Sequence, residues 1–451
     1  MDEKGFSLEN TIVVLLDEKK YTTLRDILVT MNSVDIASLF QEIPEDKLPL
    51  LFRLLPKELA AETFVEMDGD AQELLIRGFS DNELKDVINE LYVDDAVDIV
   101  EEMPANVVRR ILQQADPEMR AMINEILQYP QDSAGSIMTT EYVSLREDMT
   151  VEEAIKRIRR TGIDKETIYT CYVINPNRRL IGIVSVKALL LAEEDALIKD
   201  IMETNPIYVF TTQDKEQVAN DFNKYNFIAI PVVDVEERLV GIVTFDDAMD
   251  VMEAEATEDI EKMAAITPSD KPYLKTSVFE LWKARIPWLL LLMVSATFTG
   301  MIITSFEDAL KSYVVLTAFI PMLMDTGGNS GSQAAVTVIR GISLNEVEFS
   351  DIFRVMWKEF RVSIMCGITL AAANFVKLMI MDRVGFAVAL VVCLTLAITV
   401  ICAKFVGCVL PLLSKKASFD PAVMSSPFIT TIVDAISLVI YFRIATAMLG
   451  I

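Results

Sequence analysis

The architecture of this 451-residue chain is decided by residues 425–442, SSPFITTIVDAISLVIYF. The run is long and apolar enough to cross a lipid bilayer as a helix, yet it contains a carboxylate, Asp434. An ionised carboxylate that faced lipid would cost several kcal/mol, so we expect Asp434 to face a water-filled pathway. The alternative is a structural ion pair, in which Lys404 of another apolar run or Arg443 of the same run neutralises the carboxylate.

Five apolar stretches in the C-terminal part are each near or above the length that spans a bilayer. They cover residues 282–305, 312–339, 359–381, 384–413 and 427–450. An odd number of spans places the two termini on opposite sides of the membrane. The predicted inner loops hold most of the lysine and arginine, so we expect a cytoplasmic N-terminus and an external C-terminus. The opening residues, MDEKGFSLEN, have neither the basic nor the apolar segment of a cleaved signal peptide.

The charge is divided unequally along the chain. The first 280 residues contain 57 acidic and 28 basic residues, whereas the remainder contains 10 and 13. So acidic a part repels nucleic acid and anionic lipid and attracts cations, divalent ones above all; ordinary surface charge for solubility is the alternative. The five cysteines show no CxxC spacing and indicate neither a zinc site nor a disulfide framework. No nucleophile and base arrangement typical of an enzyme is visible.

Residues 1–128 repeat a short helical unit. Examples are LPKELAAETFVEM, DNELKDVINEL and VDDAVDIVEEMP, in which apolar residues recur three and four positions apart after a polar or proline turn. Such units predict an all-α superhelical N-terminal domain. Residues 251–280 are predicted to form an acidic connecting helix and a proline-containing hinge, which lead into an α-helical transmembrane domain with five spans over residues 281–451.

Residues 129–250 contain a second repeat, built from strands and helices. The run YVINPNRRLIGIVSVKALL is echoed by FIAIPVVDVEERLVGIVTFDDAM, and each copy predicts a β-α-β-β-α unit. The pair resembles tandem CBS domains, an α+β fold with a cleft between the two copies. In the second copy, Thr244 and Asp247 follow the G-x-x-T-x-x-D pattern that binds ribose in nucleotide-binding CBS pairs, so ATP or another adenine nucleotide is a candidate ligand. The first copy has Ala188 at the acidic position.

The second apolar stretch contains the run IPMLMDTGGNSGSQAA, residues 320–335. Its potential helix breakers are Pro321, Gly327, Gly328 and Gly331. They predict a helix broken inside the membrane, which is tolerated only where backbone groups line water or a binding site. The side chains of Asn329 and Gln333 suit hydrogen bonds to a hydrated ion. The alternative is close helix packing through small residues, which explains the glycines but not the amides.

Several motifs resemble the MgtE family of magnesium channels. They are GGNSGSQ in the second stretch, FDPAVMSSPFITTIVDAISLVIYF over residues 419–442, YPQDSAGSIMT over residues 129–139 and EAEATEDI over residues 253–260. The resemblance covers essentially the whole chain. It implies a homodimer in the bacterial inner membrane, through which Mg²⁺ enters passively along the two-fold axis. It also implies that Asp434 binds hydrated Mg²⁺ in the pore, and Asn329 and Asp325 of the second stretch are further candidate ligands there.

The same resemblance implies that cytoplasmic Mg²⁺ closes the pore by binding between acidic faces of the soluble domains. The residues at the matching positions are Glu62, Asp94, Asp98, Glu216, Asp247, Asp250, Glu255 and Glu258. Apposed carboxylates repel until a dication bridges them, and several weak sites together can supply the roughly 5.5 kcal/mol that switches a gate. The chain departs from the family pattern at Asp325, where many members have glycine. It also departs at Asn226, where we expect an acid, so one sensor site is predicted to be weakened or missing.

Two other functions are compatible with the sequence. One is a divalent cation channel that prefers Co²⁺, Ni²⁺ or Mn²⁺, but the chain contains no histidine, and an inventory of oxygen ligands favours a hard ion such as Mg²⁺. The other is a membrane-anchored CBS nucleotide sensor without transport, which predicts that Asp434→Ala leaves Mg²⁺ uptake unchanged.

Overall fold

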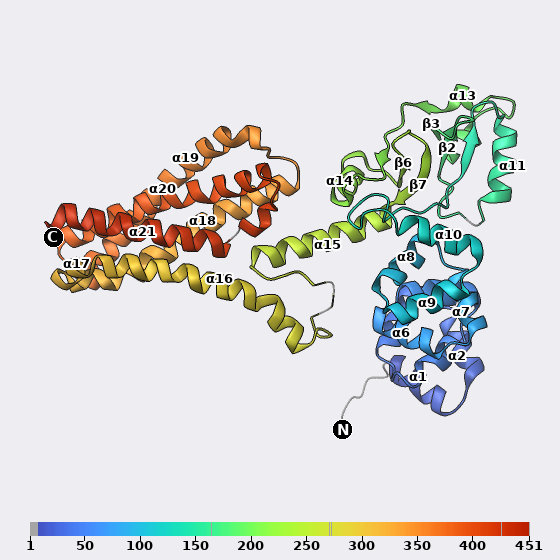
Figure 1. Cartoon of the computed structure of the whole chain (residues 1–451), viewed down its shortest axis with the longest axis horizontal. Coiled ribbons are helices and arrows are strands. Elements are labelled where there is room, and N and C mark those ends of the chain that lie inside the picture. The colour runs from blue at the N-terminus through green and yellow to red at the C-terminus, as the bar shows by residue number, and fades with distance from the viewer. Residues whose placement is uncertain (1–7, 164, 270, 272, 425, 451) are drawn as a thin grey trace. The chain divides into compact units, whose positions relative to one another are not determined.

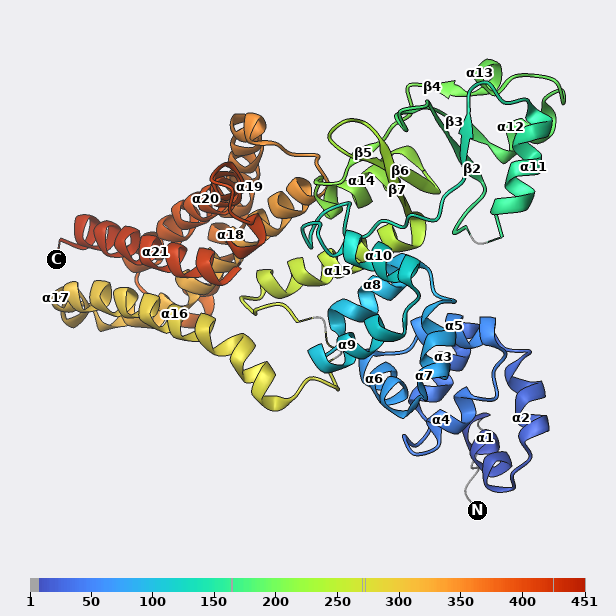
Figure 2. The ribbon, with the colours of Figure 1, turned by 45° about the vertical axis from the view of Figure 1, so that its right-hand side comes forward.

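The computed structural model describes residues 8–163, 165–269, 271, 273–424 and 426–450. It divides the chain into two compact units, of which the first ends at Met252 and the second begins at Glu253. Each unit has a hydrophobic core of its own. The short N-terminal helices, the two small sheets and the long C-terminal helices can be followed in Figures 1 and 2.

The N-terminal domain is built from short helices. They are α1 (Leu8–Asp17), α2 (Tyr21–Leu28), α3 (Ser33–Gln41), α4 (Leu48–Phe52), α5 (Lys57–Val65), α6 (Gly69–Gly78), α7 (Asp81–Ile88), α8 (Val93–Glu102), α9 (Ala105–Gln114) and α10 (Pro117–Ile126). Their apolar sides form one continuous core. Asn32, Asp68 and Ser80 cap α3, α6 and α7 by accepting hydrogen bonds from backbone N–H groups. The predicted all-α N-terminal domain is confirmed.

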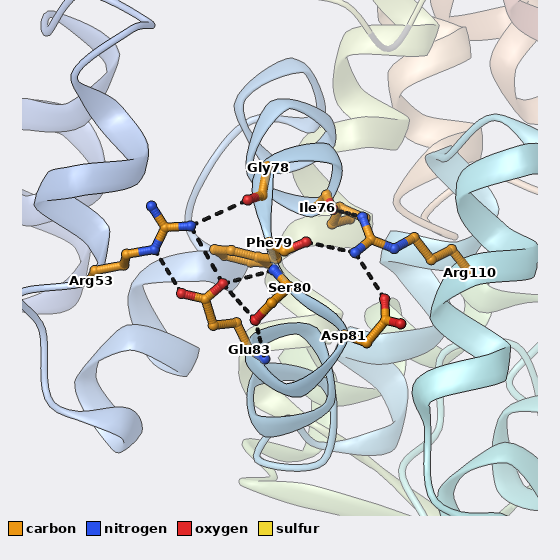
Figure 3. A network of polar contacts seen from close by, with 8 residues as sticks. All are labelled: Arg53, Ile76, Gly78, Phe79, Ser80, Asp81, Glu83 and Arg110. Carbon is orange, nitrogen blue, oxygen red and sulfur yellow. Dashed lines mark hydrogen bonds and ion pairs between the residues drawn. The ribbon is translucent and has the colours of Figure 1, made fainter.

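Two arginines hold the turn between α6 and α7 (Figure 3). Arg53, at the end of α4, donates from Nε to Glu83 Oε1 over 2.6 Å and from Nη2 to the carbonyl of Gly78 over 3.2 Å. Arg110 of α9 donates to the carbonyl of Phe79 over 2.6 Å. Because side chains from an earlier and a later helix bind the same turn, successive helical repeats are fixed relative to one another.

Two repeats of strands and helices follow within the first compact unit, each around its own sheet. The first contains β1 (Ser144–Arg146), α11 (Val151–Thr161), β2 (Thr170–Ile174), β3 (Leu180–Ser185), α12 (Val186–Leu191), α13 (Ile198–Ile201) and β4 (Glu203–Thr204); the second contains β5 (Val209–Phe210), α14 (Lys215–Tyr225), β6 (Ala229–Val233) and β7 (Leu239–Thr244). In both sheets the first strand pair is parallel and the second antiparallel. The backbone N–H of Leu180 donates to the carbonyl of Glu237, and that of Leu239 donates to the carbonyl of Arg178. The corresponding hairpin turns of the two repeats therefore pair. The predicted duplication is confirmed.

The helix α15 (Phe245–Met263) leads from the second sheet into the C-terminal unit. That unit contains α16 (Val278–Ser305), α17 (Glu307–Ser312), η1 (Val314–Phe319), α18 (Ile320–Ser343), η2 (Phe349–Asp351), α19 (Ile352–Lys377), η3 (Leu378–Asp382), α20 (Phe386–Lys416), η4 (Pro421–Met424) and α21 (Ser426–Leu449). α20 packs against α18, α19 and α21, as both views show.

Four helical segments are long and apolar enough to cross a membrane, judged by length and composition over the described residues. They are Val278–Ser305, Phe349–Asp382, Phe386–Lys416 and Pro421–Leu449. The second predicted span corresponds to α18, whose glycines and polar side chains keep it out of this set. Four spans are therefore supported by composition, and the fifth stays a prediction.

The predicted break in the second span is wrong, because α18 is one continuous helix. Pro321 stands in its first turn, where a missing N–H interrupts no hydrogen bond. The glycines that we expected to break it, Gly327, Gly328 and Gly331, are all buried. A Cβ on Gly407 of α20 would overlap the carbonyl oxygen of Gly331, so the two helices touch backbone to backbone. Close packing through small residues explains these glycines.

Candidate functional site

Asp434 lies within α21, the helix that packs against α16, α18 and α20. Its neighbours Val433 and Ser437 are buried in the helix bundle, whereas Asp434 itself is half-buried. Asp325 of α18 is exposed and lies within electrostatic range of Asp434. Carboxylates from two predicted spans therefore approach each other.

One face of α18 carries a polar stripe. Asp325, Asn329 and Gln333 recur every four residues, so they share a face of the helix, and all three are exposed. The buried glycines lie on the side that contacts α20 and α21. The two features that suggested a broken helix thus have separate explanations, since the glycines serve packing and the polar side chains line an open face.

The structural ion pair proposed for Asp434 is not found in the part of the chain that the structure describes. Lys404 Nζ lies 3.6 Å from Glu359 Oε2 of α19, and the two side chains are only 7% and 14% exposed. Arg443 is exposed and follows Asp434 by nine residues, which places it on the opposite side of α21 and roughly 13 Å along its axis. The sequence analysis did not predict Glu359 as the partner of Lys404. The available signal was an acid at the start of the third apolar stretch together with a lysine inside the fourth.

The second candidate region lies in the first unit, where α8 of the N-terminal domain comes near the start of α15. Asp94 of α8 is 7% exposed, and the charges of Asp247 and Glu166 act on it. Asp95 is also close to Asp247. Glu141, from the segment before β1, accepts a hydrogen bond of 3.2 Å from the backbone N–H of Val93 and so ties this segment to the start of α8. Asp94 and Asp247 were predicted from the sequence, whereas Asp95, Glu141 and Glu166 were not.

Burial and mutual repulsion raise the pKa values of these carboxylates. Burial, with the charge of Asp247, raises the pKa of Asp95 to about 7. Burial, with the charges of Asp246 and Asp247, raises the pKa of Glu166 to about 8. The pKa of Asp247 is raised to about 6 by burial, although its hydrogen bond from Thr244 opposes the change. Such a cluster favours binding of protons or of a cation, because either relieves the repulsion.

Two of the other predicted sensor residues lie near this cluster. Asp98 of α8 is exposed and lies within electrostatic range of Asp247, as does Asp250. Glu62 of α5 is exposed, but the residue that acts on Asp95 is Glu66, which directly follows α5. The remaining predicted residues are Glu216 at the start of α14, and Glu255 and Glu258 in the part of α15 that belongs to the second unit. Glu258 pairs with Lys262 over 2.6 Å.

The donor set fits a hydrated dication better than a fully coordinated metal. Among the described residues, no three carboxylates or thiols are close enough to hold one metal ion together. Mg²⁺ keeps several of its waters and needs only one or two carboxylates from a protein. Facing pairs such as Asp94 and Asp247 could therefore hold Mg²⁺ through one direct or water-mediated contact each.

Thr244 and Asp247, the predicted nucleotide-binding pair, contact each other. Thr244 Oγ1 donates to Asp247 Oδ2 over 2.6 Å, and Thr244 is buried at the end of β7. The hydrogen bond fixes the orientation of the carboxylate that also faces α8. Asp247 therefore lies where two of the predicted ligands would compete for it.

Asn226, which stands where we expected an acid, ends α14 in the left-handed conformation with φ of 55°. Asparagine adopts this conformation more readily than most residues. A helix cap thus accounts for the amide at this position.

Three family models match the chain. They are the MgtE intracellular N domain over residues 31–132, the CBS domain over residues 134–195 and 198–254, and MgtE, a divalent cation transporter, over residues 320–444. The chain is 35% identical to the magnesium transporter MgtE of Thermus thermophilus, over 100% of this chain and 99% of that protein. It is 34% identical to the magnesium transporter MgtE of Bacillus subtilis, over 97% of this chain and 96% of that protein.

Two solved structures resemble the first unit. One is the cytosolic domain of the Mg²⁺ channel MgtE in complex with ATP, which aligns with a TM-score of 0.52 and 35% identity over 54% of this chain and 100% of that one. The other is the soluble part of a magnesium transporter, with a TM-score of 0.52 and 29% identity over 55% of this chain and 98% of that one.

Proposed function

Because the chain belongs to the MgtE family of divalent cation transporters, we propose that it is a Mg²⁺ channel whose pore is lined by Asp434. The observation that carries the proposal is a half-buried carboxylate within an apolar helix, near a second carboxylate, while the lysine that could have neutralised it pairs with Glu359 instead. The cost of such a group in a membrane is offset where it faces water and cations.

In this proposal two copies of the chain form the pore, and each contributes one Asp434. Two carboxylates balance the charge of Mg²⁺ while the ion keeps most of its waters, which Mg²⁺ releases reluctantly. The exposed face of α18 would add Asp325 and the amides of Asn329 and Gln333 as hydrogen-bonding partners for those waters. Influx is passive and driven by the membrane potential. Five spans, with α18 as the second, place the N-terminus in the bacterial cytoplasm and the C-terminus outside.

Closure of the pore by cytoplasmic Mg²⁺ is the second part of the proposal. The acidic cluster of α8 and α15 supports it, because repelling carboxylates hold their elements apart until a dication bridges them. The proposed sensor set comprises the eight residues that the family resemblance implies, with Asp95 and Glu166 added. A bridging ion would hold α8 against the start of α15, the helix that continues into the C-terminal unit.

An adenine nucleotide is proposed as a further ligand, near Thr244 and Asp247. The support is the ribose-binding pattern and the ATP complex of the similar cytosolic domain. Because Asp247 belongs to both groups, nucleotide and Mg²⁺ binding would be coupled.

The pore proposal is tested by Mg²⁺ uptake into proteoliposomes and by growth of a Mg²⁺-auxotrophic host. Asp434→Asn keeps the shape of the side chain and removes its charge, and it is expected to abolish both uptake and rescue. Glu307→Gln, which removes a carboxylate paired with Lys311 on the exposed helix α17, is the control and should behave as wild type. Uptake by Asp434→Asn at the wild-type rate would contradict the role of Asp434, and no uptake by the wild type would favour the sensor without transport. Wild-type uptake of Co²⁺ or Ni²⁺ in preference to Mg²⁺ would contradict the proposed selectivity.

A further inference from the structure

The last turns of α15 are tied to the rest of the C-terminal unit at two places. Lys262 Nζ lies 2.6 Å from Asp420 Oδ2, in the segment between α20 and α21, and 2.6 Å from Glu258 Oε1 in its own helix. Asp259 Oδ2 accepts a hydrogen bond of 3.0 Å from Ser343 Oγ, at the end of α18. All these residues belong to the second compact unit.

Lys262 supplies a positive charge that stays in place. Two carboxylates, Asp420 and Glu258, contact its ammonium over 2.6 Å each. The side chain is 23% exposed, so water screens the ion pairs only in part. An ammonium in this position does for Glu258 and Asp420 what a bound cation would do, since it cancels their repulsion and joins the two segments that carry them.

Asp420 connects this contact to α21. Its second oxygen, Oδ1, accepts a hydrogen bond of 2.8 Å from the backbone N–H of Ala422 in η4, the turn directly before α21. Ala422 is buried in one apolar cluster with Val433 of α21, and Met263 of α15 packs against that cluster. Val433 is the residue before Asp434. The end of α15 is thus linked to the helix of the pore carboxylate by one ion pair and one packed cluster.

We propose that Lys262 is a positioning residue of the gate, whose ammonium holds α15 against the loop before α21 and favours the closed pore without any bound Mg²⁺. The inference rests on the proposed function, because it assigns the docked α15 to the closed state. Its consequence is that cytoplasmic Mg²⁺ completes a closure that the chain's own cation has begun. Loss of the ammonium should raise the Mg²⁺ concentration that closes the pore and leave the open pore as it was.

Uptake at several cytoplasmic Mg²⁺ concentrations tests the role in gating. Lys262→Met is expected to raise the half-inhibiting concentration by up to about fivefold, the upper end of the range for a partly exposed ion pair, with the maximal rate unchanged. Asp420→Asn should do the same, because an amide oxygen still caps Ala422, and the double variant should shift no further than either single one. Lys156→Met, which breaks the exposed pair with Glu152 in α11, is the matched control. An unchanged inhibition curve for Lys262→Met, or full additivity in the double variant, would overturn the proposal.

Hydrogen exchange of the full-length protein without divalent cations tests the contact itself. Lys262→Met and Asp420→Asn are expected to speed amide exchange in residues 256–263 and 420–424, and Lys156→Met is not. This readout does not depend on transport. If Asp434→Asn failed to abolish uptake, the pore proposal would fall while the exchange result still decided whether Lys262 holds α15. Exchange rates equal to wild type in both segments would refute the contact.

Discussion

Raising the pH in the absence of divalent cations is expected to destabilise the first unit, residues 1–252. Asp95, Glu166 and Asp247 have pKa values of about 7, 8 and 6 in the folded protein, all raised by burial and by neighbouring carboxylates. Between about pH 4 and pH 8 the folded state therefore holds protons that the unfolded chain has released. The slope of stability against pH is then negative, because it follows the protons bound in the unfolded state minus those bound in the folded state.

The size of the effect follows from the same pKa values. A change of one in pKa corresponds to about 1.36 kcal/mol. The rise in the pKa of Asp95 from 3.8 to about 7 therefore costs about 4 kcal/mol of folding stability once the group is ionised. The rise in the pKa of Glu166 from 4.5 to about 8 costs about 5 kcal/mol, and that of Asp247 from 3.8 to about 6 costs about 3 kcal/mol. These costs share the same charge repulsions, so we expect about half of their sum, roughly 6 kcal/mol. In a unit of this size that corresponds to a fall in Tm of about 10–20 °C between about pH 4 and pH 8.5.

Thermal unfolding of residues 1–252 in excess EDTA measures this fall. The fragment is a suitable sample because it is a compact unit and resembles cytosolic parts of magnesium transporters that were crystallised alone. Addition of Mg²⁺ at pH 8.5 should restore much of the lost stability and at pH 5 almost none, since protons then occupy the same carboxylates. Glu166→Gln should flatten the curve above pH 7, whereas Glu147→Gln, on the exposed turn after β1, should not. A Tm that is constant or rises with pH in EDTA would refute the reasoning.

Three further outcomes are expected. Gly407→Ala places a methyl group against a backbone carbonyl of α18 and should lower the stability of the full chain in thermal denaturation by about 3 kcal/mol. Gly300→Ala, whose methyl group meets nothing within 4 Å, should leave the stability unchanged. Equal Tm values for the two variants would contradict the backbone contact. Lys404→Met should lower the stability by about 3–5 kcal/mol in the same assay, because it leaves Glu359 buried and unpaired. Adding Glu359→Gln to that variant should recover most of the lost stability. An additive loss in the double variant would exclude the pairing. Asn226→Asp keeps the left-handed helix cap, which aspartate tolerates, and should lower the Mg²⁺ concentration that half-inhibits uptake by about threefold; an unchanged inhibition curve would show that this position does not contribute to the sensor.

The sequence predicted what depends on local pattern. Helical repeats, the duplicated strand and helix units and the carboxylate in the last apolar helix are all visible in periodicity and composition. The error at Gly331 has a physical reason. Glycine in a helix weakens it when the space beside it is empty and permits close packing when another backbone fills that space, and only the fold shows that Gly407 of α20 lies there.

The candidate site was predicted in part, for a similar reason. Asp434 and Asp247 stand out because they fall inside an apolar helix and a recognisable motif. Glu166 and Asp95 do not, because a carboxylate in a loop or beside another acid is ordinary in so acidic a chain, and its burial depends on which elements meet. The partner of Lys404 likewise required the packing of α19 against α20.

The carboxylates of this protein fall into two groups that should respond differently to ions. Glu359 and Asp420 each face a lysine of the same chain, so their charge is neutralised without a bound ion. Asp247 and Asp434 instead face other carboxylates, and their neighbourhoods become stable only when a proton or a cation arrives. Ion binding can move a protein only where the ion changes the balance between two arrangements. In the proposed function, the first group therefore joins its segments without an ion, and the second supplies the places at which Mg²⁺ would act.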